Sequence, residues 1–173
     1  MNEIQKRTTM RQSCTPDRPE SEQRAYFHAA LERAIAAESK AGTVERFFTL
    51  AGSVLNLKFA GDSLAGAFTP ALAHLEIAPT AYPDAVFHIW DSESTGMEMV
   101  PPPTSRGCFT SRGDIWTMGS ERYKSAYTWS EYALSLFDTV TATGVYWTPA
   151  ATTLPYWAMA SPLRCLFHLW AET

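Results

Sequence analysis

The stretch SVLNLKFA constrains the fold of this chain more than any other. Leu55, Leu57 and Phe59 alternate with Asn56 and Lys58, which is the pattern of a strand with one apolar and one polar face. A parallel sheet is covered on both faces, so its strands are apolar throughout, whereas an antiparallel sheet often has one face in water. We therefore expect an antiparallel strand here, with Asn56 and Lys58 facing solvent.

Further strands surround this one in the sequence. The segment RFFTLAG precedes it, and Gly52 and Ser53 form a break that is typical of a β-hairpin. Residues 84–92, DAVFHIWDS, are apolar on both faces, which favours a central position in the sheet. Residues 121–150 contain ERYKSAYTW, EYALSLFDTV and GVYWTPA. Their alternation and spacing predict an antiparallel meander.

The strongest helical signal lies near the N-terminus. Phe27, Leu31 and Ile35 recur every four residues, so one side of a helix would be apolar. Asp17 is a candidate N-cap, because a glutamate follows it three residues later. The pattern predicts a helix over residues 21–41.

Two shorter helices are indicated by proline and capping residues. Pro70 would begin a short middle helix over residues 70–76, PALAHLE. Ser161 as N-cap and Pro162 in the first turn predict a C-terminal helix with the sequence LRCLFHLWAET. We therefore expect an α+β fold: a mainly antiparallel sheet packed by an N-terminal helix, a short middle helix and a C-terminal helix.

Length and composition bear on the number of domains. A chain of 173 residues with 46% hydrophobic and 18% charged residues has enough apolar side chains for one compact core. Residues 1–20 are polar and contain two prolines. We expect a mobile tail over residues 1–20 and a single α+β domain over residues 21–173.

Charge and cysteine content narrow the partners and the compartment. The net charge is −4 and no basic stripe is present, so nucleic acid is not an expected partner. No apolar run approaches the roughly 18 residues that span a bilayer, and no secretory signal is visible, so no membrane is expected either. Cys14, Cys108 and Cys165 are far apart and form no CxxC motif. These features together predict a cytoplasmic protein with reduced cysteines.

The stretch FAGDSLAGAF offers two readings as a functional motif. Gly61 and Gly66 have the spacing of a phosphate-binding loop, which needs Lys and then Ser or Thr directly after the second glycine. Ala67 and Phe68 occupy those positions instead. We therefore assign no nucleotide-binding residue, and no other cofactor-binding residue, to this chain.

The same stretch contains Gly-Asp-Ser-Leu, which suggests a GDSL-type serine esterase. Ser63 directly follows a strand, as the nucleophile of such an enzyme does. The catalytic histidine usually follows an aspartate by three residues near the C-terminus, but His168 follows Cys165 at that distance. A tight turn at Gly61 leading into a helix explains the stretch more simply. Catalysis by Ser63 stays open as the alternative.

The four histidines show no metal-binding spacing. His28, His74, His88 and His168 form no HExxH motif or other ligand pair, so each is expected to be structural or exposed. Asp91 opens the segment DSES, whose oxygen atoms would suit a metal ion, but a solvated loop start is the simpler explanation. We assign no metal ligand.

Three segments of the chain together resemble a known family. They are VLNLKFAGDSLAGAFTPALAHL, FHIWDSESTGMEMVPPP and LPYWAMASPLRCLFHLW, and they are similar to the region preceding the kinase core in bacterial HPr kinase-related, serine-kinase-like proteins. The resemblance spans about residues 47–173. It rests on the order of WDS, STG, PPP, LPYW and SPLR, not on a catalytic motif. Thr104 departs from it, since a tryptophan is expected after the prolines.

The resemblance implies a function without catalysis on this chain. The kinase core would follow the last helix, with a Gly-rich loop ending in Gly-Lys-Ser or Gly-Lys-Thr, and this chain ends at Thr173 before any such motif. ATP and magnesium would then belong to an absent kinase domain, and no catalytic residue is carried over. The implied role is a non-catalytic accessory or substrate-recognition domain for HPr kinase-like serine phosphorylation. Whether the chain is a truncated fragment or a complete gene product stays open.

The C-terminal helix suggests where a partner would bind. It is apolar over more than half of its circumference, whereas a helix at the end of a lone domain usually keeps one wet face. The apolar surface near Trp170 would cover a kinase core or other partner protein, a second copy of the chain, or a groove of this domain itself. A stand-alone dimeric interaction module is therefore a further alternative.

Overall fold

The computed structural model describes residues 17–109, 113–115 and 117–173. Within these ranges, seven strands form one sheet in the order β3-β1-β2-β4-β7-β6-β5. The strands are β1 (Thr43–Leu50), β2 (Ser53–Ala60), β3 (Glu76–Ile77), β4 (Ala85–Asp91), β5 (Tyr123–Thr128), β6 (Ala133–Asp138) and β7 (Thr143–Thr148). The helices are α2 (Glu20–Ala41), α3 (Asp62–Leu72), α4 (Ser92–Thr95), α5 (Tyr156–Ala160) and α6 (Arg164–Ala171), with short 3-10 turns η1 (Ala73–Leu75), η2 (Arg106–Cys108) and η3 (Ala151–Thr153).

The α+β class is confirmed, but the sheet is mixed. Strand β4 pairs in parallel with both β2 and β7, whereas the other neighbouring strands pair antiparallel. Parallel neighbours need a crossover connection, and α3 supplies it between β2 and β4. The central position of β4 and the antiparallel meander of β5, β6 and β7 are as predicted.

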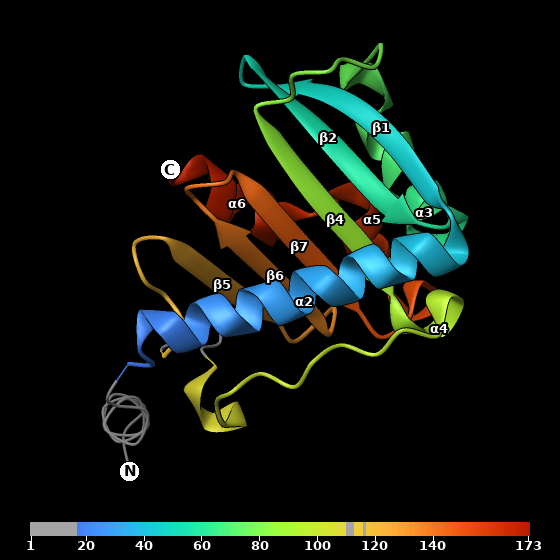
Figure 1. Ribbon diagram of the computed structural model, residues 1–173. Helices are drawn as coiled ribbons and strands as arrows, with labels where there is room; N and C mark the ends of the chain where they lie inside the picture. Colours follow the sequence, from blue (N-terminus) through green and yellow to red (C-terminus); the bar gives the residue numbers. More distant parts are fainter. Residues whose placement is uncertain (1–16, 110–112, 116) are drawn as a thin grey trace.

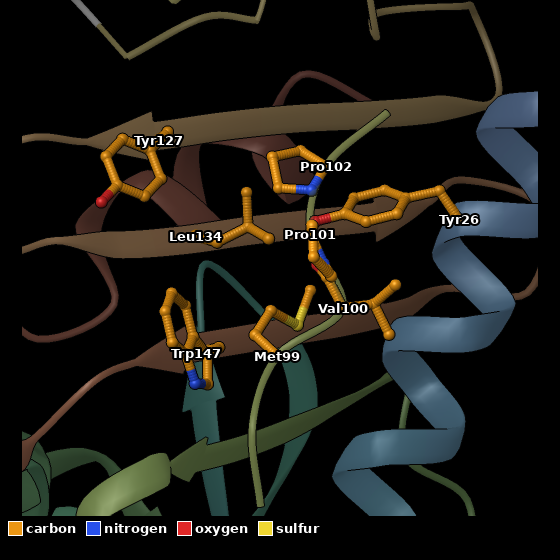
Figure 2. A pocket seen from close by; sticks show the side chains of 8 residues that line it. All are labelled: Tyr26, Met99, Val100, Pro101, Pro102, Tyr127, Leu134 and Trp147. Carbon is orange, nitrogen blue, oxygen red and sulfur yellow. The ribbon is translucent and has the colours of Figure 1, made fainter. Parts of the chain in front are cut away.

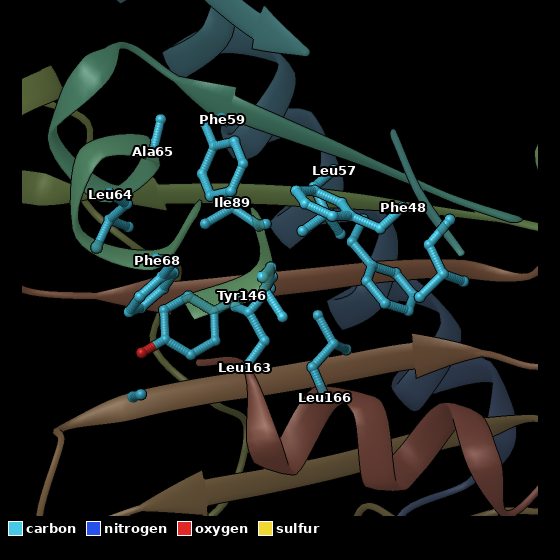
Figure 3. Close-up of a cluster of buried hydrophobic side chains, with 14 of the residues drawn as sticks. Phe48, Leu57, Phe59, Leu64, Ala65, Phe68, Ile89, Tyr146, Leu163 and Leu166 are labelled. Carbon is cyan, nitrogen blue, oxygen red and sulfur yellow. The ribbon is translucent and has the colours of Figure 1, made fainter. Parts of the chain in front are cut away.

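Helices cover both faces of the sheet. Helix α2 crosses one face, while α3, α5 and α6 lie on the other (Figure 1). The larger hydrophobic core lies between the sheet and the second group of helices, where Phe59, Ile89 and Phe68 pack near Leu166 (Figure 3). A second core lies under α2 and includes Phe27 and Trp90. Two covered faces explain why β4 is apolar on both sides.

The prediction that the polar side of β2 faces water is wrong. Leu55, Leu57 and Phe59 point into the larger core, so Asn56 and Lys58 lie on the α2 side. Asn56 is only 5% exposed, and Lys58 is half-buried. Both side chains pair with Glu45 on β1. Nδ2 of Asn56 lies 3.4 Å from Oε2 of Glu45, and Nζ of Lys58 lies 3.2 Å from Oε1 of Glu45. Nδ2 of Asn56 and Nζ of Lys58 are therefore paired within the protein, whereas the buried Oδ1 atom of Asn56 has no partner among the described residues.

The N-terminal helix agrees with the sequence in extent but not in its cap. Helix α2 begins at Glu20, so Pro19 and not Asp17 is the N-cap residue, and Gly42 follows its end with a positive φ of 85°. The predicted mobile tail lies almost wholly outside the described residues. Glu20, the last residue of the predicted tail, is already helical.

The other two helices begin at different residues from those predicted. Helix α3 begins at Asp62 and contains Pro70 near its end, so Pro70 does not start a separate helix. At the C-terminus, α5 intervenes, and Leu163 rather than Ser161 is the N-cap of α6. Leu163 adopts the left-handed conformation with φ of 57°, which capping preferences do not predict for a leucine.

Candidate functional site

The Gly-Asp-Ser-Leu stretch forms a strand-to-helix turn. Gly61 is the N-cap of α3 with φ of 75°, and its amide donates to the carbonyl of Gly42 at 2.7 Å. A Cβ atom there would lie 3.4 Å from Cβ of Ala41. Gly61 is thus explained by its positive φ, since the Cβ contact would be an ordinary one. Ser63 follows in the first turn of α3 and is half-buried.

The histidines lie apart from Ser63. His88 points to the α2 face of the sheet, where its Nδ1 atom is 2.7 Å from Oε1 of Glu38. His168 is exposed, and its Nε2 atom lies 3.1 Å from Oε1 of Glu172. His28 and His74 are exposed as well. Among the described residues, no hydrogen bond or ion pair joins Ser63 to a histidine. The geometry therefore gives no support to the esterase alternative.

The positions that a phosphate-binding loop would use have other roles. Phe68, at the place of the loop's serine or threonine, is fully buried and packs against Tyr146, with ring centroids 5.6 Å apart. Ala67 packs against the same core. Asp91, considered above as an oxygen ligand, is buried and caps α4 by accepting hydrogen bonds from Ser94. The described residues hold no group of three His, Cys, Asp or Glu side chains suited to a metal ion.

Helix α6 uses most of its apolar surface within this domain. Leu166 and Leu169 are buried in the larger core, and Phe167 and Trp170 pack partly against it. The helix lies across β5, β6 and β7. A groove of the domain itself therefore accounts for much of the apolar character that the sequence analysis assigned to a partner surface near Trp170.

Exposed aromatic side chains lie instead on α5, directly before α6 in the chain. Tyr156 and Trp157 are 76% and 46% exposed, and Met159 is exposed as well. The two aromatic rings contact each other edge to face, with centroids 5.3 Å apart. Ala158 is buried between these residues and anchors the helix to the core. We call Tyr156, Trp157 and Met159 the α5 face.

A small apolar pocket lies on the opposite face of the sheet. It encloses about 100 Å³ between α2, the proline-rich segment after α4, and β5 to β7 (Figure 2). Its lining residues are Tyr26, Met99, Val100, Pro101, Pro102, Tyr127, Leu134 and Trp147. Sites for small molecules typically measure about 300–1,000 Å³, so this pocket suits one apolar side chain at most.

Tyr26 fixes the proline-rich segment at the rim of that pocket. Its hydroxyl donates to the carbonyl of Val100 at 3.2 Å. Burial raises the pKa of Tyr26 well above its usual value, so the phenol stays protonated and keeps this hydrogen bond. The pocket is therefore a small gap beneath an anchored loop.

The cysteines differ in chemical state. Cys108 is disulfide-bonded, whereas Cys165 is a free thiol; Cys14 lies outside the described residues. The expectation of reduced cysteines is therefore wrong for Cys108. Disulfide bonds persist mainly in oxidising compartments, so this bond counts against the predicted cytoplasmic location. None of the described helices is both long and apolar enough to cross a membrane.

No family model, no curated protein and no solved structure matches this chain. The similarity to HPr kinase-related proteins therefore stays a prediction from the sequence, and the function has to be argued from the geometry.

The sequence analysis missed the α5 face. A helix of five residues is too short to show a helical period, so only the aromatic pair in LPYWAMA signals it. That segment entered the sequence analysis through the family resemblance alone. Its exposure became visible only in the fold.

Proposed function

We propose that this chain is a non-catalytic recognition domain that binds a partner protein through the α5 face. The observation that supports this proposal is the exposure of Tyr156, Trp157 and Met159 on one short helix. Tyrosine, tryptophan and methionine are enriched at protein interfaces, and aromatic residues dominate the binding energy there. Large aromatic side chains that are exposed contribute a large hydrophobic free energy when a second protein buries them.

The local structure holds the α5 face in place. Pro155 precedes the helix, and the amide of Ala158 donates to its carbonyl at 2.9 Å. Leu154 and Leu163 are buried on either side of α5. Anchored aromatic side chains lose little conformational entropy on binding, because few torsions remain free. The surface is thus pre-organised for a partner.

A serine-kinase core is the partner that the sequence resemblance suggests. In this proposal the kinase core binds ATP and magnesium, and the present chain contributes recognition of the core or of its substrate. The α5 face would make the first contact, and the half-buried Trp170 on α6 would extend it.

The test titrates this chain calorimetrically with a purified HPr kinase-like serine-kinase core. The double variant Tyr156→Ala/Trp157→Ala should bind at least tenfold more weakly, because truncating a hot-spot residue costs about 2 kcal/mol or more. Tyr82→Ala is the matched control, since Tyr82 is also an exposed aromatic residue, at 88%, outside α5. It should bind as the unaltered chain does.

Three results would contradict the proposal. Equal binding by the double variant and the Tyr82→Ala control would remove the α5 face from the interface. A dimer on a sizing column that dissociates in the double variant, without kinase binding, would favour the stand-alone interaction module. Hydrolysis of a nitrophenyl ester that disappears in Ser63→Ala would favour the esterase.

A further inference from the structure

The small pocket beneath the proline-rich segment is lined by aromatic rings from three separate elements. Tyr127 on β5, Leu134 on β6 and Trp147 on β7 are neighbours in one row across the sheet, so their side chains lie on the same face. Tyr26 reaches toward this row from α2 (Figure 2). Two rings therefore flank Leu134, and a third approaches from the covering helix.

The row leaves room for one compact group above Leu134. Neighbouring strands are about 4.8 Å apart, so β5 and β7 are about 10 Å apart across β6. A group above Leu134 is then about 5 Å from each flanking strand, and a cation is attracted to an aromatic ring within about 6 Å of its centroid. A positive charge at this place is within reach of both Tyr127 and Trp147.

The polar atoms of two of the rings are already paired within the protein. Nε1 of Trp147 donates to Oγ of Ser92 at 2.9 Å, and the hydroxyl of Tyr26 donates to the carbonyl of Val100 at 3.2 Å. The rest of the lining is apolar apart from Tyr127. A ligand that depends on hydrogen bonds would lose those that it made to water and regain few of them here.

The ring of Tyr127 is fixed by its aromatic neighbours. Phe109 stacks on Tyr127 with ring centroids 5.2 Å apart, and Trp129 meets Tyr127 edge to face at 4.9 Å. Rings that are held in this way lose little conformational entropy when a ligand binds. The pocket is thus pre-organised.

We propose that this pocket binds a quaternary ammonium group, the trimethylammonium head of choline or of a trimethylated lysine side chain. The faces of aromatic rings carry negative charge density, and cages of such rings bind quaternary ammonium ions. A trimethylammonium group has no N–H to pair, so the lining suits it better than it suits an unmodified lysine, which brings three donors.

The size and the openness of the pocket agree with this ligand. A trimethylammonium group has the shape of a neopentyl group, so it is no larger than one apolar side chain. Of the lining residues, only Tyr26 and Leu134 are buried, and Pro101 is exposed. The head can therefore enter while the rest of the ligand stays in water.

The charge of the chain also favours a cation over a neutral group of the same shape. The net charge is −4, so the field around the protein attracts cations at long range. The rings then add a short-range attraction that an uncharged group does not receive.

The test compares choline with 3,3-dimethylbutan-1-ol, which has the same shape and no charge. Each is titrated into the purified chain, and the indole N–H resonance of Trp147, assigned with Trp147→Phe, reports binding in two-dimensional NMR spectra. Choline should bind at least about fivefold more tightly, because only the cation is attracted to the ring faces. Equal or tighter binding of the alcohol would overturn the inference, since the pocket would then be merely apolar.

A pair of substitutions tests the assigned ring in the sheet. Tyr127→Leu should weaken choline binding at least about fivefold, whereas Tyr127→Phe keeps the ring and should bind as the unaltered chain does. Tyr82→Leu is the control, since Tyr82 is an exposed aromatic residue outside the pocket. Unchanged binding by Tyr127→Leu would contradict the proposal. If that variant fails to fold, the comparison of choline with the alcohol still decides.

A third comparison distinguishes the two sources of the ligand. A short peptide with trimethyllysine and the same peptide with unmodified lysine are titrated beside choline. Tighter binding of the trimethylated peptide supports a modified protein as the source, and tighter binding of choline supports a small molecule. Equal binding of the two peptides together with no binding of choline would refute the inference. The pocket and the α5 face lie on opposite faces of the sheet, so the proposed function is tested separately.

Discussion

The Nδ1 atom of His88 lies 2.7 Å from Oε1 of Glu38, and this contact joins α2 to the central strand β4. Both side chains are largely buried. On the neighbouring strand β2, Lys58 lies beside His88 in the sheet and pairs with Glu45. The α2 face of the sheet therefore combines an apolar core with paired polar groups.

Replacing Glu38 with alanine should destabilise the protein. The substitution leaves His88 without its partner in a largely buried position, so the free energy of unfolding should fall by about 1–3 kcal/mol. Urea unfolding followed by circular dichroism measures this change. Glu32→Ala is the control, because Glu32 is exposed on the same helix and should change stability by less than about 0.5 kcal/mol. Equal losses in the two variants would show that the contact contributes nothing.

Local patterns were sufficient to predict most elements of the fold. The meander of β5, β6 and β7 has a clear alternation, and the apolar segment at 84–92 predicted a central strand. The extent of α2 was also predicted, but its buried side was not: Ile35 is 47% exposed, and Ala30 and Ala34 are buried instead. The parallel pairing of β2 with β4 was not predictable, because alternation reports which faces are apolar and not the direction of a neighbour. The burial of Asn56 depends on Glu45, eleven residues away on the partner strand.

The candidate sites were harder to predict than the fold. Ser63 and Gly61 became candidates because they belong to a four-residue motif. The strand-to-helix turn explains the glycine of that motif without a catalytic role. Tyr26, Tyr127 and Trp147 line one pocket although they are far apart in the chain, so no local pattern links them. The left-handed backbone at Leu163 sets the start of α6, and a leucine gives no sign of that conformation in a sequence.

The stability contributed by Asp138 should depend on pH at the acidic end. The guanidinium of Arg122 donates to both carboxylate oxygens at 2.9 Å, and the amide of Val140 donates as well. Burial alone would raise the pKa of Asp138, but these hydrogen bonds outweigh it, so the pKa lies below its usual value. The charged form is thus favoured in the folded state.

Asp138→Asn should therefore cost about 2 kcal/mol at neutral pH. The contribution is fully present above the unfolded pKa of about 3.9 and is lost as the pH falls through the lower folded pKa. The stability difference between the two proteins should be constant from pH 7 to about pH 5 and shrink below about pH 4. Urea unfolding at each pH measures it, with the exposed Glu121→Gln as control. A difference that stays constant down to pH 3 would contradict this account.

The turn between β1 and β2 can be improved. Ala51 and Gly52 both have positive φ, at 52° and 89°, as a type I′ hairpin turn requires, and Asn-Gly is the preferred pair there. Ala51→Asn should raise stability by about 0.5–1 kcal/mol and the melting temperature by about 1–4 °C. Calorimetry measures both. Ala81→Asn, at an exposed position without positive φ, should produce no gain; a gain of equal size there would refute the explanation.

Gly144 and Gly66 should respond to alanine in opposite directions. A Cβ atom at Gly144 would lie 2.6 Å from Cδ1 of Phe87 and 3.0 Å from Cδ1 of Leu166, whereas a Cβ atom at Gly66 meets nothing within 4 Å. Gly144→Ala should push α6 away from β7 and cost about 1–3 kcal/mol. Gly66→Ala, on the exposed side of α3, should gain about 1 kcal/mol from helix propensity. Urea unfolding of both variants measures the two changes in the free energy of unfolding. Losses in both would mean that glycine is needed for flexibility rather than for the close packing of Phe87 and Leu166.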